Sequence, residues 1–232
     1  MKSLLRPLLL GSALAFVVAP PGLHAETKPA VTLPALSATQ LNEGFKSGLG
    51  TIISQALNSG TAVTVESPKA LAKVETALAK VNKTEASAGF SSALSETVAK
   101  VAPQAATLLQ GSLASLKIDD AKSLLAGGST AGTDFLKKAV APTLREQLLP
   151  LVKQATASTA LGAKAKDMLG AVGPLAGLGG KSAITDLDAY VCDQVIEQSF
   201  ALVGKQEAAV RANPALLTGS PLAQKVFALF KK

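Results

Sequence analysis

Hydrophobic residues recur at every third or fourth position along most of this chain, which is the spacing of amphipathic helices that bury one face. The first stripe follows Ser37 and Gln40, which have the spacing of a helix capping box. Its members are Leu41, Phe45, Leu49, Ile52 and Ile53. Further stripes follow Ser67 and Ser220, and each of these serines precedes a proline suited to a first helical turn. The pattern therefore predicts a succession of helices.

Prolines and capping residues predict where these helices begin and end. A hydroxyl cap is expected from Ser67. The helix that carries Phe90 is expected to end before Pro103, because proline lacks the N–H that an interior position needs. For the same reason Pro142 and Pro150 are expected to kink or divide a later helix. Other helix starts are expected at Asp119, Thr130 and Thr185.

The fold predicted from this pattern is all-α, a single-domain multi-helix bundle of roughly eight to ten helices. Residues 26–36 contain two prolines and are expected to form an extended leader, followed by one helical domain over residues 37–232. Within that domain, residues 158–184 are rich in glycine and predict a mobile loop around a short helix near residues 163–169. The glycines lack the spacing of a phosphate-binding loop.

The first 25 residues have the layout of a secretory signal peptide. Lys2 and Arg6 precede an apolar run over residues 8–18, and a small residue, Ala25, stands at the expected cleavage site. The run is shorter than the ~20 residues of a membrane-spanning helix, and no longer run follows it. We therefore expect cleavage after Ala25, a periplasmic location, and no transmembrane segment in the mature chain.

Charge and composition narrow the possible chemistry. Loss of Lys2 and Arg6 lowers the net charge from +7 to +5, and the remaining lysines are too dispersed for a nucleic-acid surface. The only histidine, His24, lies in the expected signal peptide, and the only cysteine is Cys192. Catalytic sites built on histidine and the usual zinc sites are therefore excluded, so we expect no metal and no cofactor. We expect Cys192 to be a buried, inert thiol.

Several ordered segments carry a resemblance to a known family. They are residues 41–46 (LNEGFK), 102–105 (APQA), 186–191 (DLDAYV), 206–214 (QEAAVRANP) and 225–227 (KVF). On these segments the chain resembles the bacterial domain-of-unknown-function family 4197, over about residues 41–227. Where that family usually has Asn-Arg-Ala-Ala-Glu, this chain has SETVA at residues 95–99. The resemblance implies an exported helical protein and lends no activity.

The candidate functional surface comes from the last family-like segments. It gathers Asp186, Asp188, Tyr190, Glu207 and Arg211. Each also has a structural interpretation. The aspartates lie in a first helical turn, where carboxylates stabilise free N–H groups, and Glu207 and Arg211 have the spacing of a surface ion pair.

Arg211 separates the structural and functional interpretations. It could pair with Glu207 at the surface, or it could instead reach a buried aspartate such as Asp120 or Asp188. We favour the buried aspartate, because the mature chain has only two arginines, Arg145 and Arg211, against nineteen lysines. Rare planar guanidinium groups are used where their geometry is needed.

Two functions remain compatible with the sequence. The first is a non-catalytic binding or envelope-associated module, whose groove between helices holds an unknown protein or an apolar ligand. The second is a carboxylate-dependent hydrolase acting on an envelope glycan, which needs two acids across a cleft. We favour the binding module, because the common catalytic residues are missing.

We predict that the exported protein begins at Glu26. N-terminal sequencing of periplasmic material tests this cleavage site, and the protein is expected in the soluble periplasmic fraction because no long apolar run remains. Material that begins at Met1, or that is extracted only by detergent, contradicts the prediction.

Overall fold

The computed structural model describes residues 36–58, 63–172 and 186–231. Every described residue belongs to one compact unit, Leu36–Lys232. The expected signal peptide, the leader up to residue 35, and residues 173–184 of the glycine-rich segment lie outside the described residues.

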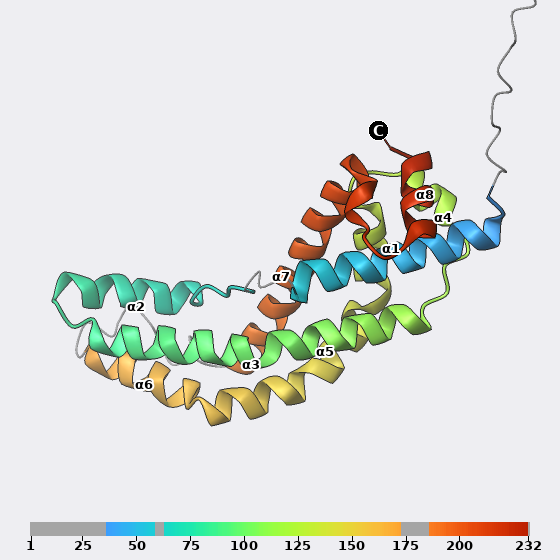
Figure 1. The fold of residues 1–232 in the computed structure, drawn as a ribbon. Helices are drawn as coiled ribbons and strands as arrows, with labels where there is room; N and C mark the ends of the chain where they lie inside the picture. The colour runs from blue at the N-terminus through green and yellow to red at the C-terminus, as the bar shows by residue number, and fades with distance from the viewer. Residues whose placement is uncertain (1–35, 59–62, 173–185, 232) are drawn as a thin grey trace, which may run out of the picture. The chain divides into compact units, whose positions relative to one another are not determined.

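Eight α-helices and no strand make up the described part of the chain, which confirms the all-α prediction (Figure 1). The helices are α1 (Ala38–Asn58), α2 (Lys69–Lys80), α3 (Glu85–Ser115), α4 (Ala121–Ala126), α5 (Ala131–Ser158), α6 (Leu161–Ala171), α7 (Leu187–Ala212) and α8 (Pro221–Leu229). A short 3-10 turn, η3 (Pro214–Leu216), joins α7 to α8. No helix among the described residues combines the length and apolarity that crossing a membrane requires.

Helix α7 packs against more of the bundle than a surface helix would, with α1, α3, α5 and α8 all in contact with it. Helices α3 and α5 pack along each other, and α6 lies against α3 and α2 (Figure 1). One buried apolar cluster joins these helices. Within this cluster, the ring of Phe45 on α1 stacks on the ring of Phe227 on α8, with the ring centroids 5.8 Å apart, so α1 and α8 pack against each other.

The expected end of a helix before Pro103 and the expected division at Pro142 or Pro150 are both wrong. Helix α3 continues through Pro103, and α5 is not divided at Pro142 or Pro150. Each interior proline costs about 3 kcal/mol. All three prolines are exposed, while the apolar faces of both helices are buried against each other, so packing along the helices outweighs the lost hydrogen bonds.

The predicted caps are partly confirmed. Ser37 and Gln40 form the capping box, with N–H donors and side-chain oxygens 3.0 and 3.2 Å apart. Asp120 caps α4 in place of Asp119, and the hydrogen bonds from Ser123 lower the pKa of Asp120. Asp186 caps α7 by accepting from the N–H of Ala189, where Thr185 was expected.

Two other expected caps are used differently. Ser67 Oγ donates to Glu75 Oε1 at 2.6 Å and makes no cap bond to α2. Ser220 precedes Pro221 at the start of α8 as predicted, and its hydroxyl bonds with that of Ser47. The short helix expected near residues 163–169 is present as α6.

The family-like segment at residues 41–46 holds the connection between α3 and α4. Lys46 Nζ donates to the carbonyls of Ala114 and Leu116 at 2.7 and 2.9 Å, at the end of α3. Asn42 donates to the carbonyl of Asp119 and accepts from the N–H of Ala121. Both side chains satisfy helix-end groups that lack helical partners, so these polar residues of the motif are structural.

We predict that Gly48→Ala lowers the free energy of unfolding by about 1 to 3 kcal/mol through overpacking. A Cβ at Gly48 would lie 2.5 Å from Phe227 Cε2, inside a buried stack. Gly111→Ala is the matched control, because Gly111 lies in the exposed interior of α3 with nothing within 4 Å of its Cβ position. It is expected to gain about 0.5 to 1 kcal/mol from helix propensity.

Urea unfolding of both glycine variants checks this prediction. If Gly48→Ala is as stable as Gly111→Ala, α1 and α8 do not approach each other at Gly48 as closely as described.

Candidate functional site

The five candidate residues lie at opposite ends of α7. Asp186, Asp188 and Tyr190 are at its start, whereas Glu207 and Arg211 are near its end. Tyr190 and Glu207 are separated by roughly 26 Å along the helix axis, at 1.5 Å per residue. The structure therefore divides the single expected surface into two clusters, each of which borders a cavity.

The two aspartates have local structural partners. Asp186 Oδ1 accepts from the N–H of Ala189 at 2.9 Å and caps α7. Asp188 Oδ1 accepts from Thr156 Oγ1 at 2.7 Å and ties the start of α7 to the end of α5. These contacts account for both carboxylates as helix-end groups.

Tyr190 lies on a polar cavity of about 490 Å³ between α7 and the segment that precedes α2. Its hydroxyl donates to the carbonyl of Glu66 at 2.9 Å. Burial, followed by the nearby negative charge of Glu66, raises the pKa of Tyr190. We call this cavity the Tyr190 groove. Its walls are Thr64, Glu66, Ser67 and Lys69 on one side, and Tyr190, Gln194 and Gln198 on the other.

Four polar side chains of the Tyr190 groove have unused hydrogen-bonding capacity. They are Thr64, Lys69, Gln194 and Gln198, and none makes a hydrogen bond or ion pair with any described residue. Each amide side chain offers two donors and one acceptor. A groove with such groups along both walls is equipped to hold a polar ligand.

Sequence reasoning identified Tyr190 and missed the rest of this groove. The one available indication on α7 was polar residues at positions 190, 194 and 198, which fall on one face of a helix. The wall formed by residues 64–69 is more than 120 positions away along the chain, so its place beside α7 depends on the tertiary fold.

At the other end of α7, Glu207 is fully buried and accepts hydrogen bonds from the start of α5. The N–H groups of Gly132 and Thr133 donate to it at 3.0 and 2.7 Å, and Thr133 Oγ1 donates at 2.7 Å. The first N–H groups of a helix lack helical partners and lie at the positive end of its dipole. Glu207, on α7, therefore caps the start of α5, a helix that comes earlier in the chain.

Arg211 completes this arrangement. Its Nε and Nη2 donate to Glu207 Oε1 at 2.9 and 2.8 Å. Its Nη1 and Nη2 also donate to the carbonyls of Leu125 and Leu124, at 2.7 and 3.0 Å, in the last turn of α4. The guanidinium carbon lies 5.9 Å from the centroid of the Phe227 ring, within cation–π range.

The favoured partner of Arg211 was wrong. Arg211 binds neither Asp120 nor Asp188, and its carboxylate partner is Glu207. The alternative of a surface pair is also wrong, because the Glu207 side chain is 0% exposed and that of Arg211 is 11% exposed. The pair is local in sequence and buried in the fold.

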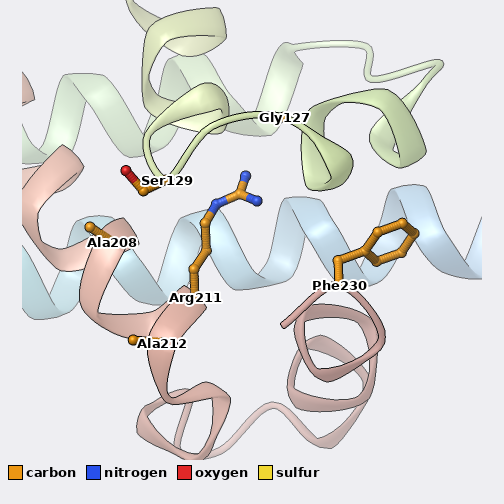
Figure 2. A pocket seen from close by; sticks show the side chains of 6 residues that line it. All are labelled: Gly127, Ser129, Ala208, Arg211, Ala212 and Phe230. Atoms are coloured by element: carbon orange, nitrogen blue, oxygen red, sulfur yellow. The ribbon is translucent and has the colours of Figure 1, made fainter. Parts of the chain in front are cut away.

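A cavity of about 190 Å³ borders Arg211, and Figure 2 shows the residues around it. The guanidinium is directed at the connection from Gly127 to Ser129, and the ring of Phe230 is turned away from it (Figure 2). Four of the five guanidinium N–H groups already donate to Glu207 and to α4. The guanidinium therefore serves the fold and leaves little capacity for a ligand.

A third cavity, of about 290 Å³ between α5 and α7, has two acids in its walls, Asp134 and Glu197. Lys137 Nζ donates to both carboxylate oxygens of Glu197, at 2.8 and 2.7 Å. Asp134 accepts from Thr130 Oγ1 at 3.1 Å. This is the arrangement of a partly exposed ion pair beside a helix-start carboxylate.

Cys192 is fully buried, as expected. Desolvation raises its pKa to about 11, so the thiol is neutral at physiological pH and is a poor nucleophile. Within the described residues, no group of three or more His, Cys, Asp or Glu side chains is placed to hold a metal ion.

These observations define the class of the molecule as an all-α bundle with a polar groove at one end of α7 and a buried ion pair at the other. The chain belongs to the family described as "Protein of unknown function (DUF4197)", which matches residues 36–228. No curated protein and no solved structure matches the chain.

We predict that Arg211→Ala lowers the free energy of unfolding by about 3 to 5 kcal/mol, because it leaves the Glu207 carboxylate buried without its cation. Arg211→Lys retains the charge but lacks the planar fork that reaches one carboxylate and two carbonyls together, so it is also expected to lose more than about 1 kcal/mol. Urea unfolding measures both values.

Arg145→Ala is the matched control. Arg145 bonds with Asp193 at 2.6 Å, but the two side chains are 45% and 52% exposed, so its removal is expected to leave the urea midpoint nearly unchanged. If both Arg211 variants unfold at the same midpoint as Arg145→Ala, Arg211 does not stabilise the bundle in the way described.

Proposed function

We propose that this protein is an exported, non-catalytic binding module of the bacterial envelope that holds a polar ligand in the Tyr190 groove. The observation that carries the proposal is the set of four polar side chains in that groove without partners among the described residues. Thr64 and Lys69 are exposed, and Gln194 and Gln198 are half-buried. Polar groups that line one cavity without partners in the protein bond to water or to a ligand.

The polarity of the proposed ligand differs from the one that the sequence favoured. The sequence favoured an unknown protein or an apolar ligand in a groove between helices, whereas the walls of the Tyr190 groove are mostly amide, hydroxyl and charged groups. Glu66 and Lys69 carry opposite charges, so the groove does not select strongly for an anion or a cation. A neutral, hydrogen-bonding ligand suits these walls better.

Export remains part of the proposal and is supported by the beginning of the sequence. Lys2 and Arg6, the apolar run and Ala25 have the order of a cleavable signal peptide. The proposed periplasmic location rests on this pattern.

The alternative is the carboxylate-dependent hydrolase. Asp134 and Glu197 line one cavity, which is the observation that favours it. A glycosidase needs one protonated acid and one free carboxylate across the bond that it cleaves. Both oxygens of Glu197 accept hydrogen bonds from Lys137, and Asp134 accepts one from Thr130 Oγ1. Both acids are thus engaged by partners within the chain, so we prefer the binding module.

We predict that a water-soluble extract of the bacterial envelope raises the melting temperature of the mature protein. At one hundred times the dissociation constant, a ligand adds about 2.7 kcal/mol of stability, or about 5 to 11 °C for a chain of this size. Gln198→Ala is expected to abolish the shift. Gln154→Ala is expected to retain it, because Gln154 is an exposed glutamine on α5 outside the groove.

Mass spectrometry of the bound fraction separates the two functions. A binding module returns its ligand chemically unchanged. Cleaved glycan products that disappear in Asp134→Asn and Glu197→Gln support the hydrolase and overturn the proposal.

A further inference from the structure

We propose that the ligand of the Tyr190 groove is an extended peptide segment of a partner protein, which pairs with the main chain of residues 63–67 as an added strand. This inference rests on the proposed function and names its ligand class. The groove combines free main-chain groups on one wall with free amide side chains on the other, and this combination matches a polypeptide backbone.

The first wall is an extended stretch of chain. Residues 63–68 contain no turn or bend, and Pro68 has a ψ of 138°, in the extended region. Exposure alternates along them, with Val63 and Val65 packed against the core while Thr64 and Glu66 are exposed. Alternation with a period of two is the pattern of a strand with one buried face. The segment therefore has the form of a single edge strand.

The main-chain groups of this strand are almost all free. Among the described residues, the only hydrogen bond to the backbone of residues 63–67 is the one that the Tyr190 hydroxyl donates to the carbonyl of Glu66. A row of unpaired N–H and C=O groups is a template for pairing with another extended chain.

The Tyr190 bond also shows which groups face the groove. The N–H and C=O of one strand residue point to the same side, and this side alternates from residue to residue. Because the carbonyl of Glu66 accepts from Tyr190, regular strand geometry places the N–H of Glu66 and both main-chain groups of Thr64 on the α7 side as well. These groups are spaced by about 7 Å, which is two strand residues. This spacing of the main-chain groups equals that of every second residue in an incoming strand.

The second wall comes from α7. Tyr190, Gln194 and Gln198 are four residues apart, so they form one row along the helix, about 12 Å long. That length accommodates three or four residues of extended chain. Each glutamine amide has the same donor and acceptor groups as a peptide bond. An inserted peptide is therefore able to bond to both main-chain groups of Thr64 and to the N–H of Glu66 at one edge, and to the glutamines at the other.

A neutral saccharide is the competing ligand chemistry, since glutamine amides also bind hydroxyl groups. The free main-chain groups favour the peptide. Their regular spacing matches that of a second backbone. The opposite charges of Glu66 and Lys69 leave this wall without a net charge to select a charged ligand. Recognition through main-chain groups tolerates many side chains, which allows the proposal to be tested with a peptide mixture.

Tyr190 supplies the measurement, because the chain contains one tyrosine and no tryptophan. Its emission reports on this groove alone. We expect a degenerate hexapeptide mixture without tyrosine or tryptophan to change the emission, and the same mixture with N-methylated backbone amides to leave it unchanged. N-methylation removes the donors that strand pairing requires and leaves the side chains intact.

Two variants of Thr64 separate the main chain from the side chain. Thr64→Pro removes the N–H that faces the groove while its φ suits an extended segment, and it is expected to weaken peptide binding about tenfold, the value of about one hydrogen bond. Thr64→Val keeps the N–H and the shape, and is expected to bind as the parent does. Melting temperatures show whether both variants fold. If Thr64→Pro does not fold, the comparison with N-methylated peptides tests the same strand pairing.

The remaining outcomes are distinct. Equal binding of both peptide mixtures overturns strand pairing. Binding of an N-acetylglucosamine oligomer that Gln198→Ala abolishes, without binding of either peptide mixture, overturns the peptide and leaves the proposed function standing. If neither these probes nor the envelope extract changes the Tyr190 emission or the melting temperature, the proposed function fails as well.

Discussion

The buried ion pair between Glu207 and Arg211 organises the helix ends around which the rest of the bundle is assembled. Removing a carboxylate from water costs several kcal/mol, which is offset only by good geometry and further hydrogen bonds. Glu207 has both, because it faces two free N–H groups at the start of α5 as well as the guanidinium. Arg211 stands at the negative end of α4, where a cation is favoured. Each charge therefore complements the dipole of a different helix.

The same centre explains why residues far apart in the chain carry the family resemblance. A Cβ at Gly132 would lie 2.9 Å from both Glu207 Oε1 and Phe45 Cζ, so only glycine allows the carboxylate to reach the start of α5. Phe45 stacks on Phe227, and Phe227 lies beside Arg211. Phe45, Phe227 and the Glu207–Arg211 pair come from three of the family-like segments, and Gly132 lies outside them. They act as one packing unit, which is why the resemblance identifies the fold and says nothing about chemistry.

The two ends of α7 differ in how far their polar groups are satisfied. Around Glu207 the donors and acceptors are matched within the chain, and this end contributes stability. Around Tyr190, side-chain amides and main-chain groups have no partner in the part of the chain that the structure describes. The hydrogen bonds of Tyr190 to Glu66 and of Ser67 to Glu75 nevertheless fix the extended segment in place. A preformed wall with unused hydrogen-bonding groups lowers the ordering cost that a ligand meets on binding. This difference is why we propose the binding role for this end.

The sequence alone determined the features that depend on neighbours a few positions apart. The all-α fold follows from the apolar stripes, and the capping box of Ser37 and Gln40 forms because its partners are three residues apart. The spacing of Glu207 and Arg211 likewise predicted their pairing as one alternative. Predictions that rested on local cost failed where distant contacts compensated, as at Pro103 in α3, whose helix is stabilised along its length by packing against α5.

Only the tertiary structure decided burial and the composition of the groove. Glu207 is buried because the start of α5, 75 residues earlier in the chain, supplies its donors. The Tyr190 groove likewise joins α7 to a segment 124 residues away. No periodicity within one helix encodes such distances, because the partners are brought together by the packing of the whole apolar core. The physical reason is that helix formation is governed by local spacing, whereas the solvation of a charge or an amide depends on every element that surrounds it.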